Sequence, residues 1–225
     1  VPGTQICELL PRHARIADKF TLLRSMAHTG GGHPAGSLQM LTGDPDPQDK
    51  EKPVFPDWMT VANFLRADRA RSLPNYVGVN PVIRYDNFTI AGSAYVNPSY
   101  GPFTVNGDPN DPHFEVPNIG FKDRAQGQRL SDRIGLKQSL DRLDRAVDQL
   151  GAMRAFDDFE TQALSLLTSS AAREAFDLSR EPNHIRDRYG RHQWGQQCLM
   201  ARRLVEAGVE IITTTFDGPL CGRVG

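Results

Sequence analysis

The strongest constraint on the fold lies near the C-terminal end, where a helical pattern is followed at once by a β-branched run. Residues 192–207 have helical periodicity, Gly208 follows as a stop signal, and Val209–Phe216 is rich in Ile and Thr. The side chains of this helix that we expect to point inward are Trp194, Cys198, Ala201 and Val205. A helix joined directly to a strand is typical of a parallel sheet with crossover helices, so the chain is predicted to have an α/β fold.

Two residues at the ends of this helix–strand unit are candidates for function. His192, at the start of the helix, could cap the helix or help to bind an anion. Asp217 follows the carboxyl end of the strand, which is the edge where α/β sheets hold their ligands. Asp217 is therefore a candidate metal ligand.

A strand–loop–helix unit is also predicted near the N-terminus. Residues 6–20 place apolar side chains at helical spacing, and Pro11 either starts or kinks this helix. Phe20–Met26 is interpreted as a short buried strand, Gly30–Gly32 as a turn, and Pro34 as part of the first turn of the next helix. This order of elements again favours a parallel sheet.

The middle of the chain is less regular. A loop rich in Asp and Pro precedes Asp57, which is expected to cap a helix that runs to about Arg69. The inward side chains of that helix are expected to be Trp58, Val61, Phe64 and Leu65. We expect a strand within residues 74–83, an irregular insertion with short strands over about 84–130, and helices again over 131–178.

Composition and charge exclude some classes of partner. The formal net charge is -1, with both signs interspersed, so bulk electrostatics do not favour a nucleic acid. No apolar run approaches the roughly 20 residues that a membrane-spanning helix needs. The three scattered cysteines form neither a disulfide framework nor a metal-type CxxC motif. The chain begins with Val and ends in a loop, so we interpret residues 1–225 as a single domain truncated at both ends.

The most chemically suggestive segment runs from His28 to Gly43, with the sequence HTGGGHPAGSLQMLTG. Its glycines let the backbone approach a ligand, and the N-terminus of the following helix favours a phosphate, sulfate or carboxylate. His28 and His33 could bind a metal ion or transfer protons, while Ser37 and Thr42 add hydroxyl groups. A tight structural turn with two incidental histidines is the alternative, and the segment has no P-loop motif.

Two stretches of the chain together resemble the DUF1501 family. The first runs from Leu10 to Gly43 and includes GHPAGS and MLTG; the second, YGRHQWGQQCLMARRLVEAG, spans residues 189–208. Members of this family are bacterial, abundant in planctomycetes, often labelled sulfatase-like, and grouped with the alkaline-phosphatase-like superfamily. The resemblance covers essentially the whole chain. It implies a partial three-layer α/β/α sandwich and export to the periplasm or the cell surface.

For function, the resemblance implies a metal-dependent hydrolase of sulfate or phosphate esters. Its substrate would be a small-molecule or glycan ester, and its divalent metal zinc, calcium or magnesium. Sulfatases carry their nucleophile in the motif C-x-P-S-R, which is followed by T-G. When that pattern is aligned with this chain through Leu41 to Gly43, His33 falls at the nucleophile position and Ser37 at the arginine position. His33 and Ser37 are therefore the candidate catalytic residues. The candidate anion-binding residues are Gly31, Gly32 and Thr42, and the candidate metal ligands are His28, His33 and Asp217.

This departure from the sulfatase motif favours an alternative function, a non-catalytic ligand- or glycan-binding surface protein on the same fold. The aromatic, Asn-rich stretch at residues 84–118 favours the same alternative. Later family segments resembling W-D-x-H and G-E-F-G-R-T-P do not occur in the sequence. We therefore expect this chain alone to lack a complete metal site.

Overall fold

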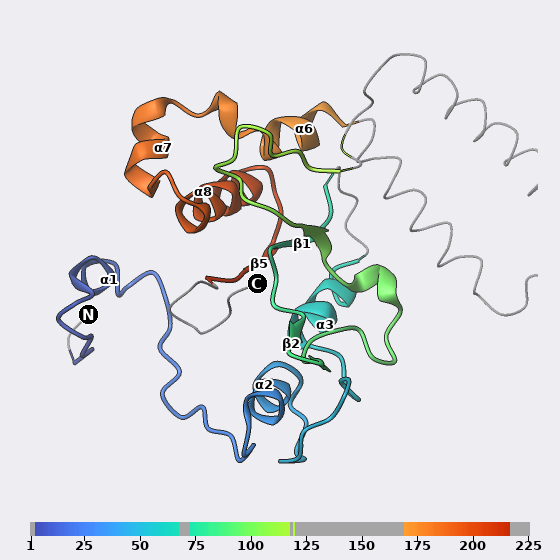
Figure 1. Ribbon diagram of the computed structural model, residues 1–225. Coiled ribbons are helices and arrows are strands. Elements are labelled where there is room, and N and C mark those ends of the chain that lie inside the picture. Colours follow the sequence, from blue (N-terminus) through green and yellow to red (C-terminus); the bar gives the residue numbers. More distant parts are fainter. Residues whose placement is uncertain (1–2, 68–72, 118, 120–168, 217–225) are drawn as a thin grey trace, which may run out of the picture.

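A computed structural model describes residues 3–67, 73–117, 119 and 169–216 (Figure 1). Its centre is a sheet of three parallel strands in the order β4 (Phe103–Val105), β1 (Tyr76–Val79) and β5 (Ile211–Thr214). Val77 of the central strand lies opposite Phe103 on one side and Ile212 on the other. The predicted α/β class is confirmed, as are the strands expected within residues 74–83 and 209–216.

The central strand β1 is buried along its whole length, as expected in the middle of a parallel sheet. Alternate side chains point to opposite faces, so Val77 and Val79 pack into one apolar cluster and Tyr76 into another. A side chain at Gly78 would collide with the turn that follows, because its Cβ would lie 2.7 Å from Cγ of Pro81. The glycine therefore lets the chain fold back directly after the strand.

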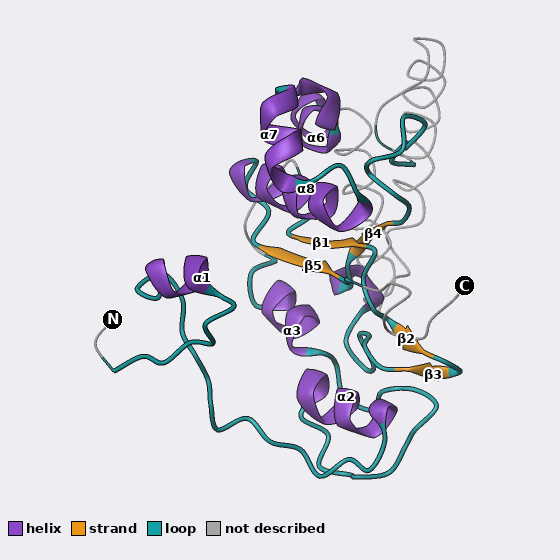
Figure 2. Cartoon of the chain, turned by 60° about the vertical axis from the view of Figure 1, so that its left-hand side comes forward, coloured by secondary structure: helices purple, strands orange, loops and turns teal. Residues whose placement is uncertain are grey.

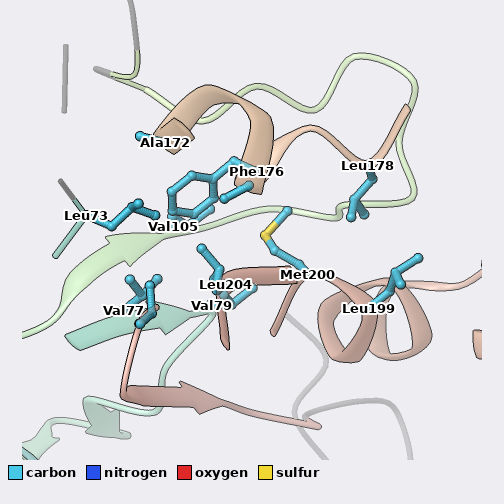
Figure 3. Close-up of a cluster of buried hydrophobic side chains, with 12 residues drawn as sticks. Leu73, Val77, Val79, Val105, Ala172, Phe176, Leu178, Leu199, Met200 and Leu204 are labelled. Atoms are coloured by element: carbon cyan, nitrogen blue, oxygen red, sulfur yellow. The ribbon is translucent and has the colours of Figure 1, made fainter. Parts of the chain in front are cut away.

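Helices cover one face of the sheet as a continuous layer (Figure 2). This layer consists of α6 (Ser170–Phe176), the short 3-10 helix η2 (Leu178–Arg180), α7 (Asn183–Tyr189) and α8 (Gln193–Glu206). Figure 3 shows the side chains of α6, α8 and the strands meeting between these helices and the sheet. The helix predicted over residues 192–207 is confirmed, and Gly208 follows it with a positive φ of 96°.

The buried face of α8 differs from the prediction. Leu199, Met200 and Leu204 are fully buried, whereas Val205 is 60% exposed. The other side chains predicted to point inward, which are only partly buried, are Trp194, Cys198 and Ala201. Gln196 explains the rotation, because its fully buried side chain binds two groups of Arg186 and the carbonyl of Gly190. The buried face of α8 therefore includes the polar side chain of Gln196, which a prediction from apolar spacing alone leaves out.

The opposite face of the sheet is covered by α3 (Trp58–Phe64), with α2 (His33–Thr42) beyond it (Figure 2). Asp57 caps α3 as predicted, because its Oδ1 accepts a hydrogen bond from the Thr60 amide at 2.8 Å. The apolar cluster on this face is small and consists of Met59, Tyr76 and Ile211, with Leu41 and Ala62 packed against it. In the described part of the chain, the sheet therefore lies between helices on both faces.

Helix α3 also turns a different side inward from the one predicted. Its buried residues are Met59, Thr60 and Asn63, while Trp58, Phe64 and Leu65 are 59%, 49% and 72% exposed. The Asn63 side chain donates to the Tyr100 carbonyl at 2.9 Å and accepts from Asn75 at 3.1 Å. These bonds tie the polar side of α3 to the sheet, and the helix ends at Phe64, earlier than expected.

The described part of residues 84–130 is irregular but not separate from the core. It contains an antiparallel pair, β2 (Arg84–Tyr85) and β3 (Phe88–Thr89), and the 3-10 helix η1 (Pro98–Tyr100). It also contains β4, which is a strand of the central sheet. The helical stripes predicted over residues 131–168 lie outside the described residues.

The described part of the N-terminal segment before α2 contains one short helix and no strand. Helix α1 (Pro11–Arg15) begins at Pro11, so this proline starts the helix rather than kinking it. The strand predicted over Phe20–Met26 is wrong, because the segment runs as extended chain from α1 toward α2 without pairing to any described strand (Figure 1). Leu23 and Met26 are 70% and 55% exposed there. Among the described residues, no helix is both long and apolar enough to cross a membrane.

Candidate functional site at helix α2

A cleft of about 690 Å³ lies against helix α2 and the loop before it. The residues that line it are His28, Gly30, Gly31, Gly32, His33, Gly36, Ser37, Met40, Leu41, Val82 and Ile90. His33, Ser37 and Leu41 are spaced four residues apart, so they share one face of α2. The structure thus brings five of the predicted site residues to one cleft, namely His28, Gly31, Gly32, His33 and Ser37.

Two glycines let the loop lie directly on the helix. A Cβ at Gly30 would lie 2.7 Å from the carbonyl carbon of Ala35, and a Cβ at Gly36 would lie 2.8 Å from Cε1 of His28. The His28 imidazole therefore covers the first turn of α2 only because position 36 is glycine. At Gly31, by contrast, no atom of the described residues lies within 4 Å of the Cβ position, so this side of the loop is open.

The imidazole of His33 packs against a tyrosine of β2. His33 is the first residue of α2, with Pro34 directly after it as predicted, and its ring stacks on Tyr85 with centroids 4.9 Å apart and an interplanar angle of 26°. Ser37 follows one turn later and is half-buried. The structure gives no hydrogen bond from the side chain of His28 or His33 to another described residue, whereas both side chains line the cleft.

A carboxylate that the sequence did not indicate lies at the start of α2. Oδ1 of Asp49 accepts a hydrogen bond from the Ala35 amide at 2.9 Å, and its Oδ2 lies 3.2 Å from the Cβ position of Gly32. The carboxylate satisfies a helix N-terminus in the way that an external anion would. The predicted anion position is therefore partly filled by the chain itself. Asp49 is 14 residues from Ala35, so local spacing carries no signal of this contact.

Gln39 clamps the loops on either side of α2, and sequence reasoning missed it as well. Its Oε1 accepts hydrogen bonds from the amides of Thr29 at 2.7 Å and Gly30 at 3.0 Å. Its Nε2 donates to the Thr29 hydroxyl at 3.0 Å and to the Asp46 carbonyl at 3.3 Å. One side chain thus holds the glycine loop against the helix that lines the cleft.

An ion pair closes the loop that carries Asp49. Nζ of Lys50 lies 2.7 Å from Oδ2 of Asp44, whose side chain is only 2% exposed. The hydrogen bond from Lys50, with a second from the Asp46 amide, lowers the pKa of the Asp44 carboxyl below its ordinary value, although burial opposes the shift. Asp44 is therefore charged at neutral pH, and the pair holds the segment between them as a closed loop beside α2.

The remaining predicted residues lie elsewhere. The hydroxyl of Thr42 donates to the Leu38 carbonyl at 2.7 Å and accepts from the Asp44 amide at 3.3 Å, and the residue is not part of the cleft lining. His192 caps α8, because its Nδ1 accepts from the Gly195 amide at 3.2 Å, which confirms the capping interpretation. Asp217 lies outside the described residues.

The described residues can be compared with the ligand sets that metal ions prefer. They contain no group of three or more His, Cys, Asp or Glu side chains that could hold a metal ion. They do place two imidazoles, those of His28 and His33, on one cleft. Imidazole nitrogen suits zinc, whereas calcium and magnesium prefer oxygen ligands. If this cleft held a metal ion, its two imidazoles would suit zinc better than calcium or magnesium.

A parallel sheet between helices, with a cleft lined by glycines and histidines beside one helix, defines an α/β protein with a candidate ligand site. The chain belongs to the DUF1501 family, described as proteins of unknown function, because the family model matches residues 1–218. The predicted family is thereby confirmed. No curated protein and no solved structure matches the chain.

Proposed function

We propose that this protein hydrolyses sulfate or phosphate esters with the help of a divalent metal ion, on a fold of the alkaline-phosphatase-like type. The observation that carries the proposal is that His28, His33 and Ser37 line a single cleft of about 690 Å³. This set combines a hydroxyl nucleophile with two imidazoles that bind metal or move protons. The open side of the loop at Gly31 leaves room for an anionic group.

Ser37 would supply the attacking hydroxyl group. His33 lies one turn earlier on the same face of α2, and in this proposal its imidazole would take the Ser37 proton or share a metal with His28. Attack by Oγ on sulfur or phosphorus breaks the bond to the alcohol oxygen, which leaves with a proton, and water then releases the sulfate or phosphate from Ser37. A divalent metal held by His28 and His33 would act as a Lewis acid toward the ester oxygens.

Hydrolysis with controlled metal content tests this proposal. Purified full-length protein is treated with EDTA, supplied with zinc, calcium or magnesium, and assayed with 4-nitrophenyl sulfate and 4-nitrophenyl phosphate. We expect metal to restore turnover of one ester, and His28→Ala and His33→Ala to lose both turnover and bound metal. His184→Ala is the matched control, because His184 is an exposed residue of α7, and it should keep both. An absence of turnover of both esters with all three metals would contradict the proposal.

Binding without hydrolysis is the second candidate function, and the position of Asp49 favours it. Its carboxylate at the Ala35 amide places a negative charge where the anion of an ester would otherwise be stabilised. A neutral ligand such as a glycan avoids this repulsion. Binding to a glycan array by protein that turns over neither ester would support this second function over the first.

A further inference from the structure

A second cleft, of about 460 Å³, lies at the carboxyl ends of β1 and β5. Apolar side chains that form its walls are Trp58, Met59, Pro81, Ile83, Ala91 and Phe216. Parallel α/β sheets hold their ligands at this edge. The volume also falls within the range of about 300–1,000 Å³ that is typical of small-molecule sites.

The two clefts adjoin each other. Leu41 of α2 and Val82, in the chain that follows β1, line both of them. Leu41 is four residues after Ser37, so the shared wall begins one helical turn from the candidate nucleophile. A ligand that binds at Ser37 and extends past Leu41 would therefore enter the second cleft.

The chemistry of the second cleft differs from that of the first. No Lys, Arg or His is among the described residues that line it. Two ionisable groups line it. Asp57 accepts a hydrogen bond from the Thr60 amide, and burial raises the pKa of Tyr76, which is 3% exposed, to about 12. The Tyr76 hydroxyl is therefore neutral at ordinary pH. The Thr214 hydroxyl turns away to Gln197 of α8, at 3.3 Å. Apart from the Asp57 carboxylate, the Tyr76 hydroxyl and the threonines at 213 and 215, the side chains that line the cleft are apolar and suit an uncharged group.

We infer that the alcohol part of the substrate is an aromatic or similarly bulky apolar group that binds in the second cleft, while its sulfate or phosphate group lies in the first. This inference rests on the proposed function. A short alkyl ester would leave the apolar walls of the second cleft in water, and a sugar ester would bury hydroxyl groups against them. Trp58, which is 59% exposed at this cleft, offers a ring against which an aromatic group packs.

Equilibrium binding of two sulfonates that cannot be hydrolysed tests the inference. Naphthalene-2-sulfonate and methanesulfonate carry the same anionic group, so titration calorimetry of the metal-loaded protein isolates the contribution of the ring. We expect naphthalene-2-sulfonate to bind at least about tenfold more tightly, which corresponds to ~1.4 kcal/mol.

Variants then locate that preference. Trp58→Ala and Ile83→Ser, which change two walls of the second cleft, should each weaken naphthalene-2-sulfonate by about fivefold or more and leave methanesulfonate unchanged. Tyr95→Ala is the matched aromatic control, because Tyr95 is 75% exposed and lines neither cleft. It should change neither affinity.

Three results would overturn the inference: equal affinity for the two sulfonates, no binding of naphthalene-2-sulfonate at millimolar concentration, or equal losses of both in the cleft variants. The measurement does not depend on turnover, so the two proposals fail separately. Selective binding by a protein that hydrolyses no ester would reject the proposed function and keep the apolar cleft. Hydrolysis without selective binding would keep the proposed function and reject the apolar cleft as the site of the alcohol group.

Discussion

The two faces of the central sheet differ in what their side chains do. The face beneath α8 is a continuous apolar cluster (Figure 3), whose fully buried members include Val77, Val79, Leu199, Met200 and Leu204. The face toward α2 and α3 has only a small cluster around Met59, Tyr76 and Ile211, and its other side chains line clefts or form polar clamps. The comparison indicates that the main apolar core lies on the α8 face, while the cleft that gathers the predicted site residues lies on the α2 face.

The largest expected effect is on stability at the α8 face. Leu204→Ala should lower the free energy of unfolding by about 2–5 kcal/mol, because Leu204 is fully buried and truncation leaves a cavity. Met40→Ala on α2, where Met40 is 38% exposed, should change it by less than about 1 kcal/mol. Urea unfolding followed by circular dichroism measures both. Equal losses of unfolding free energy in the two variants would contradict the proposed difference between the faces.

Two glutamines, one on each face of the sheet, differ in how deeply their side chains are buried. Gln196→Ala should destabilise by roughly 2–3 kcal/mol, because a fully buried side chain that binds Arg186 and two carbonyls is lost. Gln39→Ala removes a half-buried clamp from the glycine loop and should cost about 1 kcal/mol, since the freed amides reach water. The same urea titrations decide, and a larger loss for Gln39→Ala than for Gln196→Ala contradicts the expectation.

Substitutions at two glycines should affect stability and zinc affinity differently. Gly195→Ala should destabilise by about 2 kcal/mol, because its Cβ would lie 2.6 Å from the Gly190 carbonyl oxygen in the α7–α8 connection. Gly36→Ala should change stability by less than about 1 kcal/mol, because alanine favours the helix while the His28 ring moves away. Zinc affinity should show the opposite order, with a loss of at least about tenfold only in Gly36→Ala. Zinc affinity that is unchanged in Gly36→Ala would separate His28 from metal binding.

The smallest expected effect concerns the ion pair beside α2. The pKa of Asp44 is lowered in the folded protein, so its stabilising effect is present above the ordinary value of 3.8 and is lost as pH falls through the lowered value. The difference in melting temperature between wild type and Asp44→Asn should be constant from about pH 5 to 8 and shrink below about pH 4. A difference that does not vary with pH would show that charge at Asp44 does not stabilise this loop.

The sequence correctly predicted the helix starts and caps that depend only on residues close by in the chain. Pro34 at the start of α2, the Asp57 cap of α3 and the His192 cap of α8 each act within a few residues, and each occurs as expected. The same holds for Gly208, which ends the helical run before β5. The residues gathered at the cleft were also predictable in part, because His33 and Ser37 share a helix face.

Features that depend on distant partners were not predictable. The apolar run at Phe20–Met26 has the composition of a strand, yet no described strand lies beside it. The inward faces of α3 and α8 are set by hydrogen bonds of Asn63 and Gln196 to other elements, which periodicity does not contain. Asp49 reaches the start of α2 through the closed loop after the helix, so only the three-dimensional structure shows that it competes with an anion there.

The central claim, that the α2 face carries the working site, is tested most directly by removing one hydroxyl. Ser37→Ala is compared with Ser170→Ala, which changes an exposed serine at the start of α6, in steady-state hydrolysis of the ester that the metal-loaded protein prefers. We predict that kcat falls by at least about 100-fold in Ser37→Ala and stays at the wild-type value in Ser170→Ala. Wild-type turnover by the folded Ser37→Ala protein would contradict this claim.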